Sequence, residues 1–246
     1  MSAARRVRLD HRLVAAGLVA SRQQAQARIE AGEVTVGGLV RTKPGALVDA
    51  DAPVALVGDG PRFVGRGGHK LEAALDAFAV PVAGRMAADL GASTGGFTDC
   101  LLQRGAARVF AVDVGYGQLA WSLRQDPRVV VMERTNARTL DALPEPISLL
   151  VGDLSFISLR LILPAVHRLL PSGGDAVLLI KPQFEAGPDG VGRGGRVRDD
   201  AVRAQAIAGV VAEAGSQGFD VRGTVPSPLA GLKAGNVEEL IHLVRQ

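Results

Sequence analysis

Cysteine and aromatic residues are scarce in this sequence, and long apolar runs are absent. A single cysteine among 246 residues, Cys100, leaves no partner for an internal disulfide bond. Aromatic residues make up 4% of the chain, and residues 1–57 contain none, so base stacking is excluded for that segment. No stretch reaches the roughly 18 consecutive apolar residues of a membrane-spanning helix, and the first ten residues lack the apolar core of a signal peptide. We therefore expect a cytoplasmic protein that makes no membrane contact.

Metal-ligand patterns and lysine are also sparse. The four histidines lie far apart in the sequence and no His/Cys cluster has ligand spacing, so we expect no metal site. Only four lysines stand against 24 arginines. Lys181 directly follows the apolar run 177–180, where a lysine can assist proton transfer, whereas an arginine stays protonated. A surface lysine with its charged end in solvent is the alternative interpretation.

Positive charge is concentrated near the N-terminus, although the net charge of the chain is only +3. This concentration of positive charge favours contact with a polyanion, and a basic surface that merely faces solvent explains the charge equally well. The candidate contacts are Arg5, Arg6, Arg8, Arg12, Arg22, Arg28 and Lys43.

The first 60 residues have the pattern of a small α+β module. Residues 8–17 and 22–31 have helical spacing, and residues 34–36, 39–40 and 54–57 are predicted strands. The sequence R-L-D-x-x-L-V-x-x-G-L-x-x-S-R-x-x-A-x-x-x-I-x-x-G-x-V-x-V-x-G closely resembles the S4 RNA-binding domain. The resemblance implies that residues 1–60 grip the backbone and shape of RNA rather than its base sequence.

Strands alternate with helices in the rest of the chain, after a glycine-rich linker at residues 61–68. Such alternation over residues 69–246 predicts an α/β fold, a Rossmann-like, mostly parallel seven-stranded sheet with helices on both faces. The predicted strands span residues 86–90, 108–112, 128–132, 147–152, 175–180, 219–225 and 237–244. Helices are predicted over residues 118–124 and 159–170, and residues 185–198, rich in glycine and arginine, are expected to form an irregular loop.

Residues 85–98, R-M-A-A-D-L-G-A-S-T-G-G-F-T, predict a strand, a tight glycine turn and a helix start. A dinucleotide fingerprint would place glycine where Ser93 stands, and a Walker loop would end in G-K-[ST]. The pattern instead looks like the first motif of S-adenosylmethionine (SAM) methyltransferases, and an ordinary βα turn without ligand is the plain alternative. The predicted cofactor residues are Asp89, Gly91, Ala92, Ser93, Gly95, Gly96, Asp113 and Asn136.

Four further motifs sharpen the resemblance. Lys70 in G-G-H-K-L, Asp153 in G-D-L-S-F, Lys181 in I-K-P-Q-F-E and Glu238 in G-N-V-E-E match, in order, the Lys-Asp-Lys-Glu tetrad of FtsJ-type ribose 2′-O-methyltransferases. Together with the S4-like module, the chain resembles the TlyA family over residues 8–244. That resemblance implies SAM-dependent 2′-O-methylation of cytidine in ribosomal RNA. Lys181 would take or stabilise the proton, Asp153 would orient Lys181, and Lys70 and Glu238 would complete the network.

Other interpretations stay open at this stage. The chain ends at Gln246 without the extra C-terminal helix of longer family members, and the resemblance to the shorter form implies the large ribosomal subunit as partner. We also expect a monomer. A non-catalytic RNA-binding or ribosome-assembly factor would not need the four tetrad positions. A membrane-active haemolysin, the family's other name, would need an apolar or strongly amphipathic segment. A dinucleotide oxidoreductase is disfavoured by Ser93.

Overall fold

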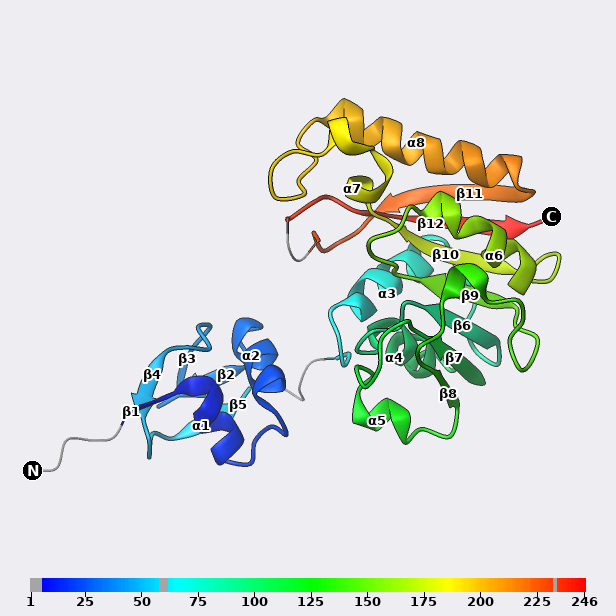
Figure 1. The fold of residues 1–246 in the computed structure, drawn as a ribbon. Helices are drawn as coiled ribbons and strands as arrows, with labels where there is room; N and C mark the ends of the chain where they lie inside the picture. Colours follow the sequence, from blue (N-terminus) through cyan, green and yellow to red (C-terminus); the bar gives the residue numbers. More distant parts are fainter. Residues whose placement is uncertain (1–5, 58–61, 232–233) are drawn as a thin grey trace, which may run out of the picture. The chain divides into compact units, whose positions relative to one another are not determined.

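The computed structural model describes residues 6–57, 62–231 and 234–246, in two compact units that divide after Arg62 (Figure 1). The sequence places residues 61–68 in a linker, whereas helix α3 (Gly67–Ala77) already begins at Gly67. The ring of Phe63 packs over Gly68, where a Cβ atom would lie 2.3 Å from the ring, and Phe63 belongs to the core of the second unit. Phe63 and the start of α3 are therefore parts of that unit.

The N-terminal unit packs two helices against short strands. Its helices are α1 (Leu9–Ala15) and α2 (Arg22–Glu30), and Ser21 caps α2 by accepting a hydrogen bond from the Gln24 N–H. One sheet has the order β3–β2–β5, and β1 pairs with β4 antiparallel. The buried core consists of Leu9, Leu13, Val19, Ala25, Ile29, Val34 and Val48. The strands are β1 (Arg6–Arg8), β2 (Val34–Val36), β3 (Leu39–Val40), β4 (Leu47–Asp49) and β5 (Val54–Leu56).

The second unit is built on a seven-stranded sheet of order β11–β12–β10–β9–β6–β7–β8. The five strands from β10 to β8 are parallel, and β12 runs antiparallel to both of its neighbours. The predicted fold class is thus confirmed. The strands are β6 (Met86–Leu90), β7 (Arg108–Val112), β8 (Val129–Met132), β9 (Leu149–Gly152), β10 (Asp175–Ile180), β11 (Phe219–Pro226) and β12 (Glu239–Arg245).

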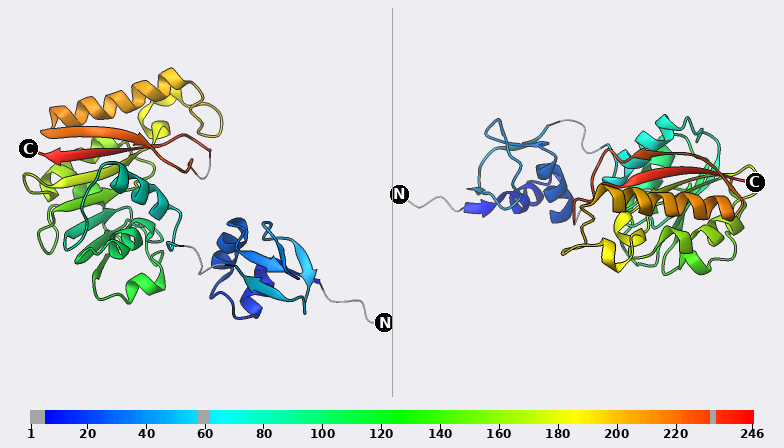
Figure 2. Two further views of the ribbon diagram at one scale, coloured as in Figure 1. Left: turned by 180° about the vertical axis from the view of Figure 1, so that it is seen from behind. Right: turned by 90° about the horizontal axis from the view of Figure 1, so that it is seen from above.

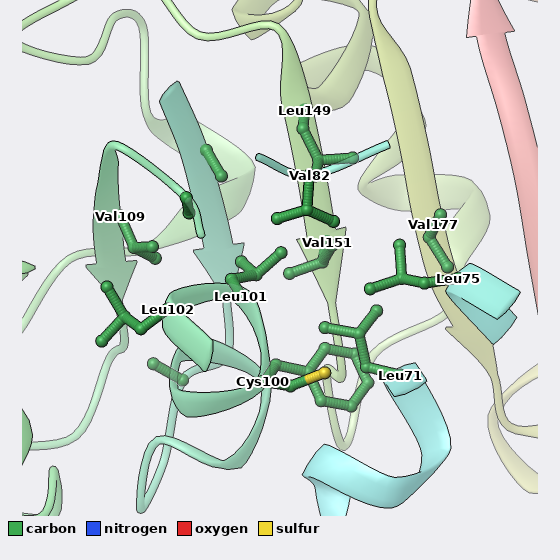
Figure 3. Close-up of a cluster of buried hydrophobic side chains, with 14 of the residues drawn as sticks. Leu71, Leu75, Val82, Cys100, Leu101, Leu102, Val109, Leu149, Val151 and Val177 are labelled. Atoms are coloured by element: carbon green, nitrogen blue, oxygen red, sulfur yellow. The ribbon is translucent and has the colours of Figure 1, made fainter. Parts of the chain in front are cut away.

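Helices cover both faces of this sheet, so the parallel strands are buried on both sides. Helices α3 and α4 (Gly96–Gln103) pack with one set of alternating strand residues, and Figure 3 shows Leu71, Cys100, Val151 and Val177 in that cluster. Helices α6 (Leu163–Leu169) and α8 (Asp200–Ser216) pack on the other face. Seen from above in Figure 2, α3 in cyan and α8 in orange lie on opposite sides of β12 in red.

Strand register brings several loops to one edge of the sheet. Leu90 at the end of β6 pairs with Gly152 at the end of β9, and Gly152 pairs with Leu178 of β10. The glycine turn, Asp153 and Lys181 therefore follow neighbouring strands at the same edge, the usual place for a ligand site in such sheets.

Three elements differ from the expectation. The helix predicted over residues 159–170 is a 3₁₀ turn, η2 (Leu159–Leu161), followed by α6, because Pro164 is tolerated only in the first turn of an α-helix. Helix α5 is limited to Trp121–Arg124. The segment 185–198, expected to be irregular, begins with the last residue of α7 (Pro182–Glu185) and contains a 3₁₀ turn, η3 (Pro188–Gly190).

Candidate active site

A cavity of about 500 Å³ lies at the carboxyl edge of β6, β9 and β10. Its walls come from α3, the glycine turn, the loops that follow β9 and β10, and the segment that precedes β12. Among the residues that line it are Gly91, Ser93, Lys70, Asp153, Lys181 and Glu238. The volume is in the range of pockets that bind cofactors and small ligands.

The glycine turn is held in a conformation that its sequence makes possible. Gly91 and Gly95 have φ angles of +84° and +99°, and Ser93 has +49°, in the left-handed region that favours glycine. A Cβ atom on Gly91 would lie 2.8 Å from the carbonyl oxygen of Asp153, so this glycine allows the turn to pack directly on the loop after β9. Asp113, at the end of β7, accepts hydrogen bonds from the Ser93 N–H (2.8 Å) and the Gly115 N–H (2.6 Å).

Asp89 lies beneath the turn and is fully buried. Its Oδ2 accepts a hydrogen bond from the Thr98 hydroxyl at 2.7 Å, while its Oδ1 has no hydrogen-bond partner in the described part of the chain. Burial raises the pKa of Asp89 to about 7 despite the Thr98 hydrogen bonds, which act in the opposite direction. Asp89 thus joins the end of β6 to the first turns of α4.

Lys70 and Glu238 form the first of two ion pairs in the cavity. The Lys70 Nζ lies 2.5 Å from the Glu238 Oε2, and the side chains are 10% and 2% exposed. Lys70 projects from the start of α3 and Glu238 immediately precedes β12, so the pair joins elements 168 positions apart. A buried pair of this kind needs both members, because either charge alone would be unpaired in a weakly polar environment.

Lys181 and Asp153 form the second pair. The Lys181 Nζ lies 2.6 Å from the Asp153 Oδ1 and donates a hydrogen bond to the Ser155 hydroxyl at 2.7 Å. Lys181 directly follows β10 and Asp153 directly follows β9, so the sheet register itself brings the two side chains together. Two lysines and two carboxylates leave the net charge of the site close to zero.

Two polar residues that support the site were missed by sequence reasoning. Glu185 on α7 is buried and accepts hydrogen bonds from the Ser158 hydroxyl and the Leu159 N–H, both at 2.6 Å. It thus ties the helix after Lys181 to the loop after Asp153. Asn236 is also buried and connects the segment before Glu238 to residues 195 and 197. Both belong to motifs with catalytic candidates, but no spacing rule distinguishes such supports.

The predicted cofactor residues divide into two groups. Gly91, Ser93 and Gly96 line the cavity. Asn136 lies outside its lining and caps η1 (Ala137–Thr139) by accepting a hydrogen bond from the Arg138 N–H. Four other predicted cofactor residues also lie outside the cavity lining among the described residues, and they belong to the glycine turn or support it: Asp89, Ala92, Gly95 and Asp113.

The basic residues of the N-terminal unit are organised around a carboxylate that sequence reasoning did not single out. Asp10 is fully buried and accepts two hydrogen bonds from Arg8, at 3.0 and 2.8 Å, and one from Gln26. Arg22 approaches the same carboxylate at 3.6 Å. The Arg8 hydrogen bond, followed by that of Gln26, holds the pKa of Asp10 well below its usual range although burial opposes this. Asp10 therefore holds two predicted RNA contacts in place.

Arg28 corrects the predicted basic surface. Its side chain is 8% exposed and pairs with Glu33 at 2.7 Å. Ala25, Arg28 and Ile29 are the buried positions of α2, so Arg28 faces the interior of the unit. Arg5 lies outside the described residues. Of the other predicted contacts, Arg6 and Lys43 are exposed and Arg12 is half-buried.

Two features of the described residues bear on other functional classes. No group of three or more His, Cys, Asp or Glu residues is arranged to hold a metal ion in this part of the chain. Among the same residues, no helix combines the length and apolar character that crossing a bilayer requires.

Comparison with known proteins identifies both units. The family model described as FtsJ-like methyltransferase matches residues 63–245, and the S4 domain model matches residues 7–54. A 16S/23S rRNA (cytidine-2′-O)-methyltransferase TlyA from Mycobacterium tuberculosis is 52% identical over 99% of this chain and 91% of its own length. Hemolysin A of Brachyspira hyodysenteriae is 40% identical over 97% of this chain and 100% of its own length.

The fold of the whole chain also has a solved counterpart. A structure described as a hemolysin from Streptococcus thermophilus superposes with a TM-score of 0.77 at 43% identity, covering 99% of this chain and 90% of that one. The motifs that carried the resemblance thus lie within family matches that span nearly the full sequence. The chain belongs to the FtsJ-like methyltransferases and, among them, to the TlyA family, with an S4 domain at its N-terminus.

Proposed function

We propose that this enzyme transfers a methyl group from SAM to the ribose 2′-hydroxyl of a cytidine in ribosomal RNA. One observation carries the proposal: the Lys70–Glu238 and Lys181–Asp153 pairs face the same cavity as the glycine turn. The relative from M. tuberculosis carries this activity in its name, for both 16S and 23S rRNA. We propose 23S rRNA of the large subunit as the substrate here, modified by a monomeric enzyme in the cytoplasm.

The walls of the cavity suit SAM as the cofactor. Gly67, Gly91 and Gly96 line it, so backbone rather than side chains borders this side of the cavity and a ligand can approach closely. Ser93 adds a hydroxyl, and Phe97 adds an apolar surface. These residues would hold SAM, which supplies a methyl group already activated by its sulfonium. The described residues contain no cluster of three or more His, Cys, Asp or Glu side chains that could hold a metal ion beside a cofactor.

The two ion pairs account for the rest of the chemistry. A ribose 2′-hydroxyl is a weak nucleophile, so the enzyme must position its oxygen and assist the loss of its proton. Lys181, held by Asp153 and Ser155, presents its Nζ to the cavity and would stabilise the negative charge that develops on the 2′-oxygen. Lys70 and Glu238 line the same cavity and would hold the oxygen in line with the methyl group.

Phe156 offers a surface for the acceptor base. It lines the cavity, is 80% exposed and lies with its ring centroid 5.6 Å from that of Phe184. Its φ angle of +64° is uncommon for a residue with a large side chain, and such strain is typical of functional positions. Unstacked RNA bases commonly stack on exposed aromatic rings. We propose that the base of the modified nucleotide does so on Phe156.

The N-terminal unit would supply the affinity for RNA. Arg8 and Arg22, both held by Asp10, and the exposed Arg6 and Lys43 present positive charge without aromatic rings. This composition suits contacts with phosphates and with RNA shape rather than with base edges. The unit would thus capture the RNA, and the cavity would perform the reaction.

The proposal is tested by incubating the protein with SAM labelled in its methyl group and with unmethylated large and small ribosomal subunits. We expect label in 23S rRNA, recovered as 2′-O-methylcytidine on nucleoside digestion and mass spectrometry. Lys181→Ala should lower the rate by about 10²–10⁴, the usual contribution of a group that assists proton transfer. Arg222→Gln, an exposed change on β11, is the matched control and should keep the wild-type rate.

Two results would contradict parts of the proposal separately. Label on a base, or no label in either RNA, would exclude ribose methylation. Label confined to the small subunit would leave the chemistry intact and exclude the large subunit as the substrate.

A further inference from the structure

The loop of residues 191–198, which precedes α8 (Figure 1), carries three arginines that the active-site chemistry does not use. Arg193, Arg196 and Arg198 are all exposed. In the described part of the chain none of the three side chains forms an ion pair or a hydrogen bond. Among the described residues of the same unit, nine other arginines form ion pairs with carboxylates, at positions 85, 104, 108, 124, 128, 160, 168, 203 and 222.

The arginine loop, residues 191–198, is an ordered turn. The Gly192 N–H donates to the Arg196 carbonyl oxygen at 2.9 Å, and the Gly195 N–H donates to the Gly192 carbonyl oxygen at 3.1 Å. Gly194 and Gly195 have φ angles of +76° and +78°, which close this turn with little strain. Arg193 thus lies in the turn itself, and Arg196 lies at the bridge position opposite Gly192.

A buried side chain fixes this loop to the catalytic segment. The Asn236 amide donates to the Gly195 carbonyl oxygen at 2.8 Å, and its Oδ1 accepts from the Val197 N–H at 2.9 Å. Asn236 is 1% exposed and stands two residues before Glu238. Gly194, Gly195 and Asn236 all line the cavity. The arginine loop therefore forms part of the cavity wall, and Arg193 and Arg196 directly flank the two glycines that line the cavity.

Resting on the proposed function, we infer that the arginine loop binds the phosphate backbone of the RNA next to the nucleotide that enters the cavity. Guanidinium groups without carboxylate partners are free to pair with phosphates in bidentate geometry. A nucleotide whose ribose reaches Lys181 has its neighbouring phosphates within a few ångströms of the cavity rim, to which Gly194 and Gly195 of this loop belong. The loop would thus hold the acceptor strand at the site, independently of the S4 domain.

The test compares two triple variants of the full chain with the same change in net charge. R193Q/R196Q/R198Q removes the arginine loop charges, and R128Q/R168Q/R222Q removes three charges that are paired with carboxylates. Binding to a ribosomal RNA fragment is measured at several salt concentrations, together with SAM affinity and thermal unfolding. A third variant, R193K/R196K/R198K, restores the charge without the guanidinium groups.

We expect R193Q/R196Q/R198Q to weaken RNA binding about tenfold or more. The slope of log K against log salt should fall by about two, as the loss of three phosphate contacts predicts. SAM affinity and the unfolding temperature should stay at wild-type values. The lysine variant should keep the wild-type salt slope, and R128Q/R168Q/R222Q should bind RNA as the wild type does.

An unchanged salt slope in R193Q/R196Q/R198Q, or an equal loss in the matched variant, would overturn the inference. Weaker association with whole subunits but unchanged binding to naked RNA would also overturn it, and would assign the loop to a ribosomal protein. RNA binding is measured without methyl transfer, so this test does not depend on activity. A wild-type protein that transfers no methyl label would contradict the proposed function but would leave the binding test of the arginine loop valid.

Discussion

At the scale of single residues, the Lys70–Glu238 pair shows how stability and catalysis depend on the same charges. Removing one member of a buried pair leaves the other charge unpaired, which typically costs about 3–5 kcal/mol. We expect Glu238→Gln to lower the free energy of unfolding by about 3 kcal/mol and to abolish methyl transfer. Replacing both residues, in K70M/E238Q, should recover most of the stability but none of the activity. Urea unfolding and the labelled-methyl assay measure the two effects; recovered activity in K70M/E238Q would contradict the assigned role.

Asp89 gives a pH dependence whose sign follows from its burial. Its pKa is raised to about 7, against about 3.9 for an unfolded aspartate. The folded state therefore binds the extra proton between about pH 4 and pH 7, so the stability that this group contributes is fully present below about pH 4. That contribution is lost as the pH rises to about 7 and changes no further above it.

Asp89→Asn removes this titration and keeps an acceptor for the Thr98 hydroxyl. The stability of the variant relative to wild type should rise by a few kcal/mol between about pH 4 and pH 7 and then level off. Unfolding curves of both proteins at each pH measure this difference, in which the other titrating groups cancel. A difference that does not vary with pH would show that Asp89 is ionised in the folded state throughout this range.

At the scale of secondary-structure elements, the glycine turn couples the cofactor side of the cavity to the catalytic side. Gly91→Ala would introduce a Cβ atom 2.8 Å from the Asp153 carbonyl oxygen, at a φ of +84°. Gly84→Ala is a matched control, because Gly84 has a φ of +75° and nothing lies within 4 Å of the place that its added methyl group would take. Gly84→Ala should cost only the left-handed backbone penalty, about 1–2 kcal/mol, and leave kcat unchanged. Gly91→Ala should cost more stability and lower kcat at least tenfold, because it displaces Asp153; equal kcat values would contradict this coupling.

The sequence predicts strands well where they are continuous buried runs and poorly where a short strand depends on pairing with a distant segment. The strands ending at Leu90, Val112 and Ile180 are apolar runs with a charged residue at or just after their ends, which makes them recognisable as buried parallel strands. Strands β1 and β4 are three residues each, and they exist only because they pair with one another. A pairing between segments about 40 residues apart leaves no periodic pattern in either one.

The candidate site was predictable to the extent that it lies at strand ends. Lys181 and Asp153 follow neighbouring strands, so their proximity follows from topology. The proximity of Lys70 and Glu238 does not follow from the order of the parallel strands, because Glu238 precedes β12, which is antiparallel. Asn236 and Glu185 act through backbone groups of irregular loops, which sequence spacing does not encode. The burial of Arg28, by contrast, was visible in its helical spacing from Ala25 and Ile29.

At the scale of the whole molecule, each unit has a hydrophobic core of its own. The core of the N-terminal unit contains Leu9, Leu13 and Ile29, and that of the second unit begins with Phe63 and Leu71. Units with separate cores are expected to fold separately. The cavity, both ion pairs and the glycine turn belong entirely to the second unit. The chemistry and the capture of RNA can therefore be separated by truncation.

A chain that starts at Arg62 retains Phe63, which packs over Gly68 at the start of α3, and should therefore fold. We expect it to bind SAM with wild-type affinity and to transfer methyl groups at a wild-type kcat when RNA is saturating. Its KM for RNA should rise at least tenfold and depend less steeply on salt, because the phosphate contacts of Arg6, Arg8, Arg22 and Lys43 are gone. Asp10→Asn in the full chain should cause part of the same rise, since Asp10 holds Arg8 and Arg22. An unchanged KM in the truncated chain would mean that the second unit alone captures the RNA, and a lost affinity for SAM would mean that the S4 domain supports the cofactor site.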